Sequence, residues 1–203
     1  GDRKFPKSAA DLIRRKFSKN RAESLMWNLL EAFQHIIYDK ILILEDDDWY
    51  APRYIQQMVV RLQNYDLVGE GLAHYYHVKW RQYLQNRNRK HSSLCQTGLS
   101  ICALKALYVS CQNKQSTFVD CRLWEKKLRK NVFCDFALCC GIKGMPGREG
   151  IGAGHRHKLS YKDDPELKVL QSWIGKEDTE FYAQFYKPET RNKQTVVNRR
   201  KRA

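Results

Sequence analysis

A regular pattern of apolar residues predicts a helix over residues 20–37. The apolar side chains recur at spacings of three and four residues, which places them on one helical face. They are Ala22, Leu25, Met26, Leu29, Leu30, Phe33, Ile36 and Ile37. Asn20 is suited to cap this helix, with Glu23 three residues later as in a capping box. The apolar run 41–44 then predicts a strand buried on both faces, and a helix leading into such a strand is typical of an α/β fold.

The rest of the chain continues this alternation of helices and strands. In chain order the pattern predicts a helix from Pro52 to about Leu62, strands over 66–69, 72–84 and 98–101, a turn or short helix over 105–111, a helix over 120–130 and a strand over 133–142. Six glycines and one proline make residues 141–154 a predicted loop. Segment 191–203 contains six basic residues and no acidic residue, a composition that predicts a flexible arm. We therefore expect a single domain over residues 1–190, followed by this basic arm.

Composition narrows the class of protein. With 42% hydrophobic and 12% aromatic residues, the 203-residue chain is too apolar for a disordered protein and long enough for one sizeable core. No apolar run approaches the length of a membrane span, and no secretory signal opens the chain. These features predict no integral membrane segment and a cytoplasmic location, in the host cell if the protein is viral. The seven cysteines form no CxxC pair, so we expect buried, reduced thiols.

The strongest chemical feature is the acidic run Glu45-Asp46-Asp47-Asp48, directly after the predicted strand 41–44. The carboxyl ends of strands are where open α/β sheets bind ligands. Four adjacent carboxylates repel one another, so we expect a compensating cation, and oxygen ligands of this kind suit Mg²⁺ or Mn²⁺. The alternative is a solvated acidic turn before the next helix, whose N-terminus favours negative charge.

The segment Ile41-Leu-Ile-Leu-Glu-Asp-Asp-Asp-Trp-Tyr-Ala-Pro52 resembles the DxD region of family-2-like glycosyltransferases of the GT-A type. The resemblance implies an α/β, GT-A-like mixed sheet flanked by helices, in which carboxylates hold a divalent metal and the ribose of a nucleotide-sugar donor. It implies Asp47 as metal ligand and Glu45, Asp46 and Asp48 as donor-binding residues, and whether Glu45 or Asp46 contacts the ribose stays open. The family's first nucleotide-binding strands have no counterpart here, because residues 1–19 show no strand pattern.

A second segment fits the same resemblance. Phe118-Val-Asp-Cys-Arg-Leu-Trp124 is similar to the part of these enzymes that carries the catalytic base before a helix, which implies Asp120 as the base. An ordinary helix N-cap is the alternative interpretation of Asp120. Glu125 and Asp135 are weaker candidates for the base.

The predicted glycine loop is the third segment. Its glycines allow the backbone to approach phosphates, and Lys143, Arg148 and Arg156 supply positive charge for the donor. The resemblance implies His155 as a further metal ligand, with His157 on the same side if the segment is extended. A purely structural loop is the alternative.

These residues together imply a metal-dependent transfer of sugar from a nucleotide-sugar, most simply a UDP-sugar. The metal, Mn²⁺ or Mg²⁺, would stabilise the leaving diphosphate, and Asp120 would deprotonate the acceptor hydroxyl. A single displacement would invert the configuration of the sugar, as the resemblance implies, although retention stays open.

The charge balance bears on the acceptor. The 37 Lys and Arg residues against 22 Asp and Glu residues give a net charge of +15, which favours a polyanionic partner. One basic block interleaves cations with aromatic rings, as in proteins that contact phosphates and stack on bases. Its residues are Lys79, Trp80, Arg81, Tyr83, Arg87 and Arg89. We expect DNA with hydroxymethylated pyrimidines as the acceptor, as in bacteriophage DNA-modifying glycosyltransferases, which must expose the base that they modify. The alternatives are a saccharide, lipid or protein acceptor, or a nucleic-acid-binding module without turnover.

Overall fold

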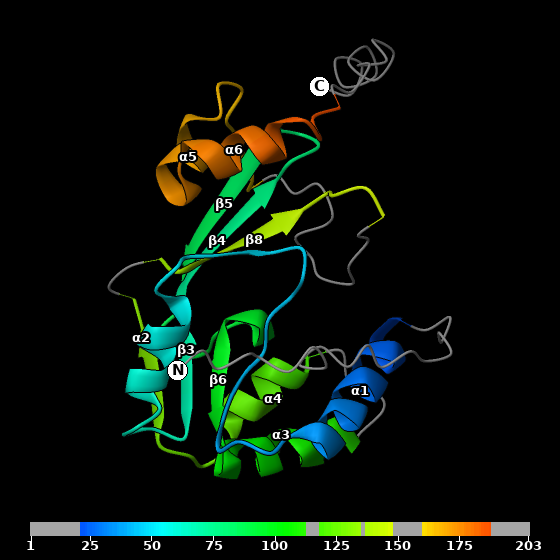
Figure 1. Cartoon of the computed structure of the whole chain (residues 1–203), viewed down its shortest axis with the longest axis vertical. Helices are drawn as coiled ribbons and strands as arrows, with labels where there is room; N and C mark the ends of the chain where they lie inside the picture. Colours follow the sequence, from blue (N-terminus) through cyan, green and yellow to red (C-terminus); the bar gives the residue numbers. More distant parts are fainter. Residues whose placement is uncertain (1–20, 113–117, 135–136, 148–159, 188–203) are drawn as a thin grey trace, which may run out of the picture.

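The computed structural model of the chain describes residues 21–112, 118–134, 137–147 and 160–187, and shows an α/β fold with two mixed sheets (Figure 1). The elements in chain order are α1 (Arg21–Ala32), the 3-10 helix η1 (Phe33–His35), β1 (Lys40–Leu42), β2 (Trp49–Tyr50), α2 (Tyr54–Arg61), β3 (Leu67–Glu70), β4 (Leu72–His77), β5 (Gln82–Arg87), the 3-10 helix η2 (Leu94–Gln96), β6 (Thr97–Ser100), α3 (Ile101–Gln112), α4 (Val119–Glu125), β7 (Lys130–Phe133), β8 (Cys139–Lys143), β9 (Lys162–Asp163), α5 (Lys168–Ile174) and α6 (Lys176–Ala183).

The first sheet has the strand order β1-β6-β3-β7. Strand β6 runs antiparallel to both of its neighbours, and β3 and β7 are parallel. Successive residues of a strand point to opposite faces, and both faces of β3 are covered. Leu67 packs into a core with α1, α3 and α4, whereas Val68 packs into a second core with Tyr54 and Met58 of α2. This sheet is therefore a layer between helices.

The second sheet has the strand order β2-β8-β4-β5-β9, in which β4 and β8 are parallel. Its core includes Tyr76 and Ile142 from the strands and Leu170 and Ile174 from α5. Figure 1 shows β4, β5 and β8 beside α5 and α6 at one end of the molecule, with α1, α3 and α4 at the other end. The chain passes between the two sheets several times, for example from β1 of the first sheet to β2 of the second.

Several predicted elements are confirmed. The helix after Pro52 is α2, and the strands over 66–69 and 98–101 are β3 and β6. The predicted strand 72–84 is a hairpin of β4 and β5, paired from Leu72↔Arg87 to His77↔Gln82. The region 105–111 belongs to a full helix, α3, and the helix expected over 120–130 ends at Glu125.

Three predictions about individual segments are wrong. The strand expected over 41–44 is β1, Lys40–Leu42, and it is only partly buried. Ile41 and Leu42 pack against different cores, but β1 is an edge strand that pairs only with β6 among the described residues, and Leu44, beyond its end, is 50% exposed. The helix at 20–37 ends earlier, at Ala32, and Ile37 is 83% exposed. The apolar run 133–142 is not one strand, since it is divided between β7 of the first sheet and β8 of the second. Asn20 and the arm 191–203 lie outside the described residues.

All seven cysteines lie in the described part of the chain and are free thiols, as expected. Only four of them are buried, and Cys102 is exposed. The prediction of buried thiols is therefore correct for the residues that line strands and cores, namely Cys95, Cys111, Cys139 and Cys140.

Candidate functional site

The acidic run forms a tight turn between the two sheets. It joins β1 of the first sheet to β2 of the second, and the Asp48 N–H donates to the Glu45 carbonyl at 3.3 Å. Asp46 is exposed, Asp47 is half-buried, and Asp48 is buried. The turn thus brings its first and last carboxylates together and leaves the middle two at its corner.

The Asp48 carboxylate is held by strand β8. Because β2 pairs with β8 through Trp49↔Cys140, the residue before Trp49 lies beside the end of β8. Asp48 Oδ1 accepts a hydrogen bond from the Ile142 N–H at 2.8 Å and one from Lys143 Nζ at 3.1 Å. The Asp48 side chain is 0% exposed. Lys143 is therefore placed in the acidic turn by strand pairing.

Lys143 forms ion pairs with both ends of the turn. Its Nζ lies 3.7 Å from Glu45 Oε2 as well as 3.1 Å from Asp48 Oδ1, and its side chain is 7% exposed. Burial by itself would lower the pKa of Lys143, but the Asp48 and Glu45 carboxylates outweigh it and raise this pKa above its usual range. The chain thus supplies one of the cations that the acidic run requires.

Cys95, in η2, is the third group of the site. Glu45, Asp48 and Cys95 each offer one ligand atom, and these atoms all lie within 4.8 Å of one another. The Tyr50 hydroxyl links the backbones of Glu45 and Cys95, since it donates to the Cys95 carbonyl at 3.0 Å and accepts from the Glu45 N–H at 2.9 Å. The thiol of Cys139 and burial raise the pKa of Cys95, so its thiol is neutral unless a cation displaces the proton.

This group of atoms fits a divalent cation. Two carboxylates and a thiol are ligand types that first-row divalent metals accept. Asp48 Oδ2 is buried and has no hydrogen-bond partner among the described residues, which is unusual for a carboxylate oxygen. The set includes Glu45 and Asp48, which were assigned to the donor, and it does not include Asp47. The assignment of Asp47 to the metal stays a prediction, and Asp48 joins it as a candidate ligand.

The sequence alone did not indicate Cys95. Its place in the site follows from the antiparallel pairing of β1 with β6, which brings the residues after β1 beside those before β6. A prediction of that pairing would have been the signal, because Cys95 lies two residues before β6 and Glu45 lies three residues after β1.

Asp120 lies in the first turn of α4, and it is half-buried. The N-cap residue of α4 is Phe118, so the interpretation of Asp120 as the N-cap is wrong. Its Oδ1 accepts a hydrogen bond from the Cys121 N–H at 2.9 Å. Helix α4 belongs to the helical layer of the first sheet, and the role of Asp120 as base stays a prediction. Glu125 is exposed at the end of α4, and Asp135 lies outside the described residues.

The loop predicted over residues 141–154 is wrong at its start, because residues 141–143 belong to β8 and the loop follows Lys143. Gly144 has a φ of +81°, and a Cβ there would lie 2.3 Å from the His77 ring, so only glycine fits this close approach. Arg148, His155, Arg156 and His157 lie outside the described residues, and their proposed contacts with the donor and the metal stay predictions.

Part of the predicted nucleic-acid surface is engaged within the fold. The Trp80 ring stacks on His77 at 3.6 Å between centroids, and the Tyr83 ring packs edge-to-face on Trp173. The Arg81 guanidinium lies 4.2 Å from the centroid of the Tyr186 ring. These aromatic rings therefore pack against protein side chains.

The other cations of this block are more accessible. Lys79 is half-buried in the turn between β4 and β5, whereas Arg87 and Arg89 are exposed. Contact with the sugar-phosphate backbone of a nucleic acid requires only accessible positive charges of this kind. Arg87 and Arg89 are the residues of the block that best suit that contact.

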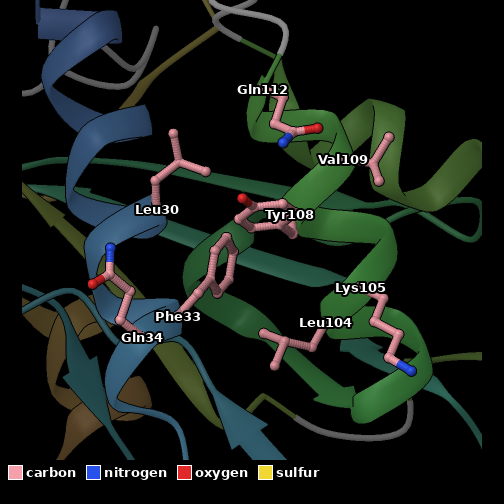
Figure 2. Close-up of a pocket in the computed structure, with 8 residues that line it drawn as sticks. All are labelled: Leu30, Phe33, Gln34, Leu104, Lys105, Tyr108, Val109 and Gln112. Carbon is pink, nitrogen blue, oxygen red and sulfur yellow. The ribbon is translucent and has the colours of Figure 1, made fainter.

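An open apolar groove lies elsewhere, between α1 and α3. Figure 2 shows its lining, in which Phe33 and Tyr108 stand face to edge across the groove. The lining residues are Leu30, Phe33, Gln34, Leu104, Lys105, Tyr108, Val109 and Gln112. Lys105 is its one titratable cation, and no carboxylate is present among them. The groove therefore lacks the chemistry of the acidic turn.

Comparison of the sequence with models of known protein families, and with curated proteins, finds no match. Within the described ranges, no helix combines the length and apolar character needed to cross a membrane.

Proposed function

We propose that this chain is a metal-dependent glycosyltransferase with a GT-A-like fold, which moves a sugar from a nucleotide-sugar donor to an acceptor hydroxyl. One observation carries the proposal. The acidic turn that resembles a DxD motif lies between two sheets, and its Glu45 and Asp48 carboxylates converge with the Cys95 thiol. A buried Asp48 oxygen is left without a hydrogen bond there, as a cation ligand would be.

The residues of the turn have distinct roles in this proposal. The Glu45 and Asp48 carboxylates would hold a divalent cation, Mn²⁺ or Mg²⁺, which would neutralise the diphosphate of the donor. The Cys95 thiol lies close enough to be a further ligand, but a thiol suits softer metals and not Mg²⁺. Asp46 and Asp47, at the corner of the turn, are accessible to the ribose or to the cation. Lys143 would contribute a positive charge to the diphosphate. Asp120 would take the proton of the acceptor hydroxyl, and one displacement would invert the sugar.

The proposed acceptor is a hydroxymethylated pyrimidine in DNA. The net charge of +15 and the exposed Arg87 and Arg89 support this choice, because phosphate contacts dominate DNA affinity. The internal packing of Trp80 and Tyr83 favours the alternative of a saccharide, lipid or protein acceptor. The acceptor is therefore tested separately from the transfer reaction.

The decisive experiment measures nucleoside diphosphate release from UDP-, GDP- and ADP-sugars with Mn²⁺, Mg²⁺ or a chelator. Hydroxymethylated duplex DNA, unmodified DNA and oligosaccharides are offered as acceptors. We expect release that needs the metal and the modified DNA, together with a thermal shift by the same donor. Release of nucleoside diphosphate with oligosaccharides alone would identify the acceptor as a saccharide and not as DNA. No release and no thermal shift with any donor would exclude the enzyme and leave a binding module.

Removing two exposed charges is expected to weaken DNA binding. The double variant Arg87→Gln, Arg89→Gln should raise the Kd for duplex DNA by about tenfold and reduce the salt slope of log Kd by about 2, since each phosphate contact releases counterions. Fluorescence anisotropy over a range of salt concentrations measures both quantities. Lys168→Gln, Lys176→Gln is the matched control, because both side chains are exposed on α5 and α6. An equal loss in the control would show that only net charge matters.

Asp120→Asn is expected to lower turnover about a hundredfold while donor affinity is unchanged, because a general base acts on the acceptor and not on the donor. The measurement is kcat at saturating acceptor, with donor Kd from calorimetry. Glu125→Gln, at the end of the same helix, is the control. A full rate in Asp120→Asn together with a loss in Glu125→Gln would transfer the role to Glu125.

A further inference from the structure

The cluster of Glu45, Asp48 and Cys95 already contacts a cation that belongs to the chain. Lys143 Nζ contacts both carboxylates, at 3.7 Å and 3.1 Å, from a side chain that is 7% exposed. We propose that the Lys143 ammonium and a divalent cation are alternative partners of this cluster, so that the metal binds as Lys143 leaves the carboxylates. This exchange adds a step to the proposed function. It rests on that function in one respect, because the anion that the displaced Lys143 ammonium would contact is the diphosphate of the donor.

The Asp48 carboxylate shows that Lys143 alone does not satisfy the cluster. Oδ1 is satisfied by the Ile142 N–H and by Lys143, whereas Oδ2 has no N–H or O–H donor in the described part of the chain, and only the Cys95 thiol, a weak donor, lies beside the carboxylate. The side chain is 0% exposed, so water does not compensate from outside. A buried carboxylate oxygen left in this state is costly. An ion that bound Oδ2 would remove that cost, and the Glu45 carboxylate and Cys95 thiol are placed to share it.

Electrostatic repulsion makes the two occupants compete. If Lys143 stayed in place, a dication on these carboxylates would lie a few ångströms from the ammonium in a buried site, where solvent screens charges poorly. Lys143 therefore lowers the affinity of the metal-free cluster for metal. The same ammonium keeps Asp48 paired when no metal is bound, which a buried carboxylate requires.

The position of Lys143 allows its side chain to leave. It is the last residue of β8, and Gly144 follows it with a φ of +81°. Its flexible four-carbon stem can reorient while the backbone of β8 stays paired with β4. A nucleoside diphosphate beside the turn offers the ammonium a new anionic partner. Binding of that ligand and binding of metal should then favour each other, and this coupling is reciprocal.

The first test compares Mn²⁺ binding by wild type and by Lys143→Met, with calorimetry and without any nucleotide. We expect the variant to bind Mn²⁺ at least about tenfold more tightly, since the competing charge is gone. Lys168→Met is the matched control, because its side chain is 79% exposed on α5 and its loss changes the net charge equally. An Mn²⁺ affinity of Lys143→Met equal to or weaker than that of wild type would overturn the proposal.

The second test uses the wild-type protein, so it holds even if Lys143→Met does not fold. Reductive methylation followed by mass spectrometry measures how accessible the Lys143 amine is. We expect little labelling in the metal-free protein and several-fold more at saturating Mn²⁺, because the metal expels the ammonium. Lys168 serves as the internal reference. Unchanged labelling of Lys143 in the Mn²⁺-bound protein would show that both cations bind together, which contradicts the exchange.

A third arm adds UDP as the anionic probe. UDP should tighten Mn²⁺ binding several-fold in wild type and less in Lys143→Met, since the variant has no ammonium to receive. Equal tightening in both proteins would exclude Lys143 as the carrier of the coupling. None of these measurements needs a sugar donor or turnover. A protein that shows the exchange but releases no nucleoside diphosphate would contradict the glycosyltransferase alone, and an active enzyme without the exchange would contradict only this inference.

Discussion

Replacing Asp48 with asparagine is expected to lower the free energy of unfolding by about 3 kcal/mol and to reduce metal-dependent turnover about a thousandfold. The loss of stability has a direct cause. Lys143 is 7% exposed, and in the variant its ammonium keeps only the Glu45 carboxylate at 3.7 Å, which is itself 48% exposed. A buried ion that loses its partner is costly, whereas the asparagine oxygen still accepts from the Ile142 N–H. The loss of activity follows from the loss of a charged cation ligand.

Two variants separate these effects. Asp47→Asn changes the neighbouring carboxylate of the turn, which is half-buried and was the predicted metal ligand. Asp163→Asn removes an exposed carboxylate on β9 and is the control for net charge. Urea unfolding and turnover are measured for all three. If Asp47→Asn abolishes metal-dependent turnover and Asp48→Asn loses only stability, Asp47 is the metal ligand and Asp48 serves the ion pair. An Asp48→Asn protein as stable as wild type would contradict the buried pair.

The sequence predicted the fold where the signal is local. The periodic apolar residues of α2 and the short apolar strands β3 and β6 lie where the pattern places them. The pattern failed where a strand's neighbours decide its environment. Phe133 and Cys139 pack into one core, although the first belongs to β7 and the second to β8 of the other sheet. Residues buried in either sheet are equally apolar, so the sequence does not mark the change of sheet.

The edge position of β1 illustrates the same limit. The apolar run 41–44 predicts a strand buried on both faces, but β1 lies at the edge of its sheet within the described ranges, and its residues are only partly buried. Sheet order depends on which distant segments pair, and periodicity contains no information about this choice.

Only part of the candidate site was predicted, because the rest depends on which strands pair. The acidic run is contiguous, so the sequence revealed it without any knowledge of the fold. Lys143 and Cys95 reach it through strand pairings, β2 with β8 and β1 with β6. Strand β2 contains only Trp49 and Tyr50, which is too short for any periodic signal. The glycines after Lys143 therefore suggested a phosphate contact, whereas the pairing places its ammonium between two carboxylates.

A second large effect is expected from Glu70, at the end of β3. Its side chain is buried at 0% exposure, and both carboxylate oxygens lie 2.9 Å from the Leu138 nitrogen. Burial raises the pKa of Glu70 from 4.5 to about 8, although the N–H groups of Leu138 and Cys139 oppose this shift. The nearby Tyr54 hydroxyl and Cys139 thiol also have raised pKa values, so they stay neutral over this range.

The sign of the pH dependence follows from proton binding. Between pH 4.5 and about 8 the folded protein keeps the Glu70 proton that the unfolded chain releases, so the free energy of unfolding falls as the pH rises through this interval. At 1.36 kcal/mol per pH unit, the interval corresponds to a loss of up to about 5 kcal/mol. Glu70→Gln has no proton to lose, and its amide oxygen can still accept from the Leu138 N–H. The variant should therefore gain stability relative to wild type as the pH rises from about 5 to about 9.

Urea unfolding of wild type and Glu70→Gln across this pH range measures the difference directly. A constant offset between the two proteins, from the unpaired amide NH₂ of the glutamine, does not affect the slope that is compared. Glu166→Gln is the control, because it removes the same charge from a side chain that is 67% exposed. Parallel stability curves for wild type and Glu70→Gln would mean that Glu70 is ionised in the folded protein. In that case the hydrogen bond from the Leu138 N–H group, and not burial, would determine the pKa of the Glu70 carboxylate. The expected outcome is a wild-type protein that by about pH 8 has lost a third or more of its free energy of unfolding while Glu70→Gln keeps it, since a domain of this size has only about 5–15 kcal/mol in total.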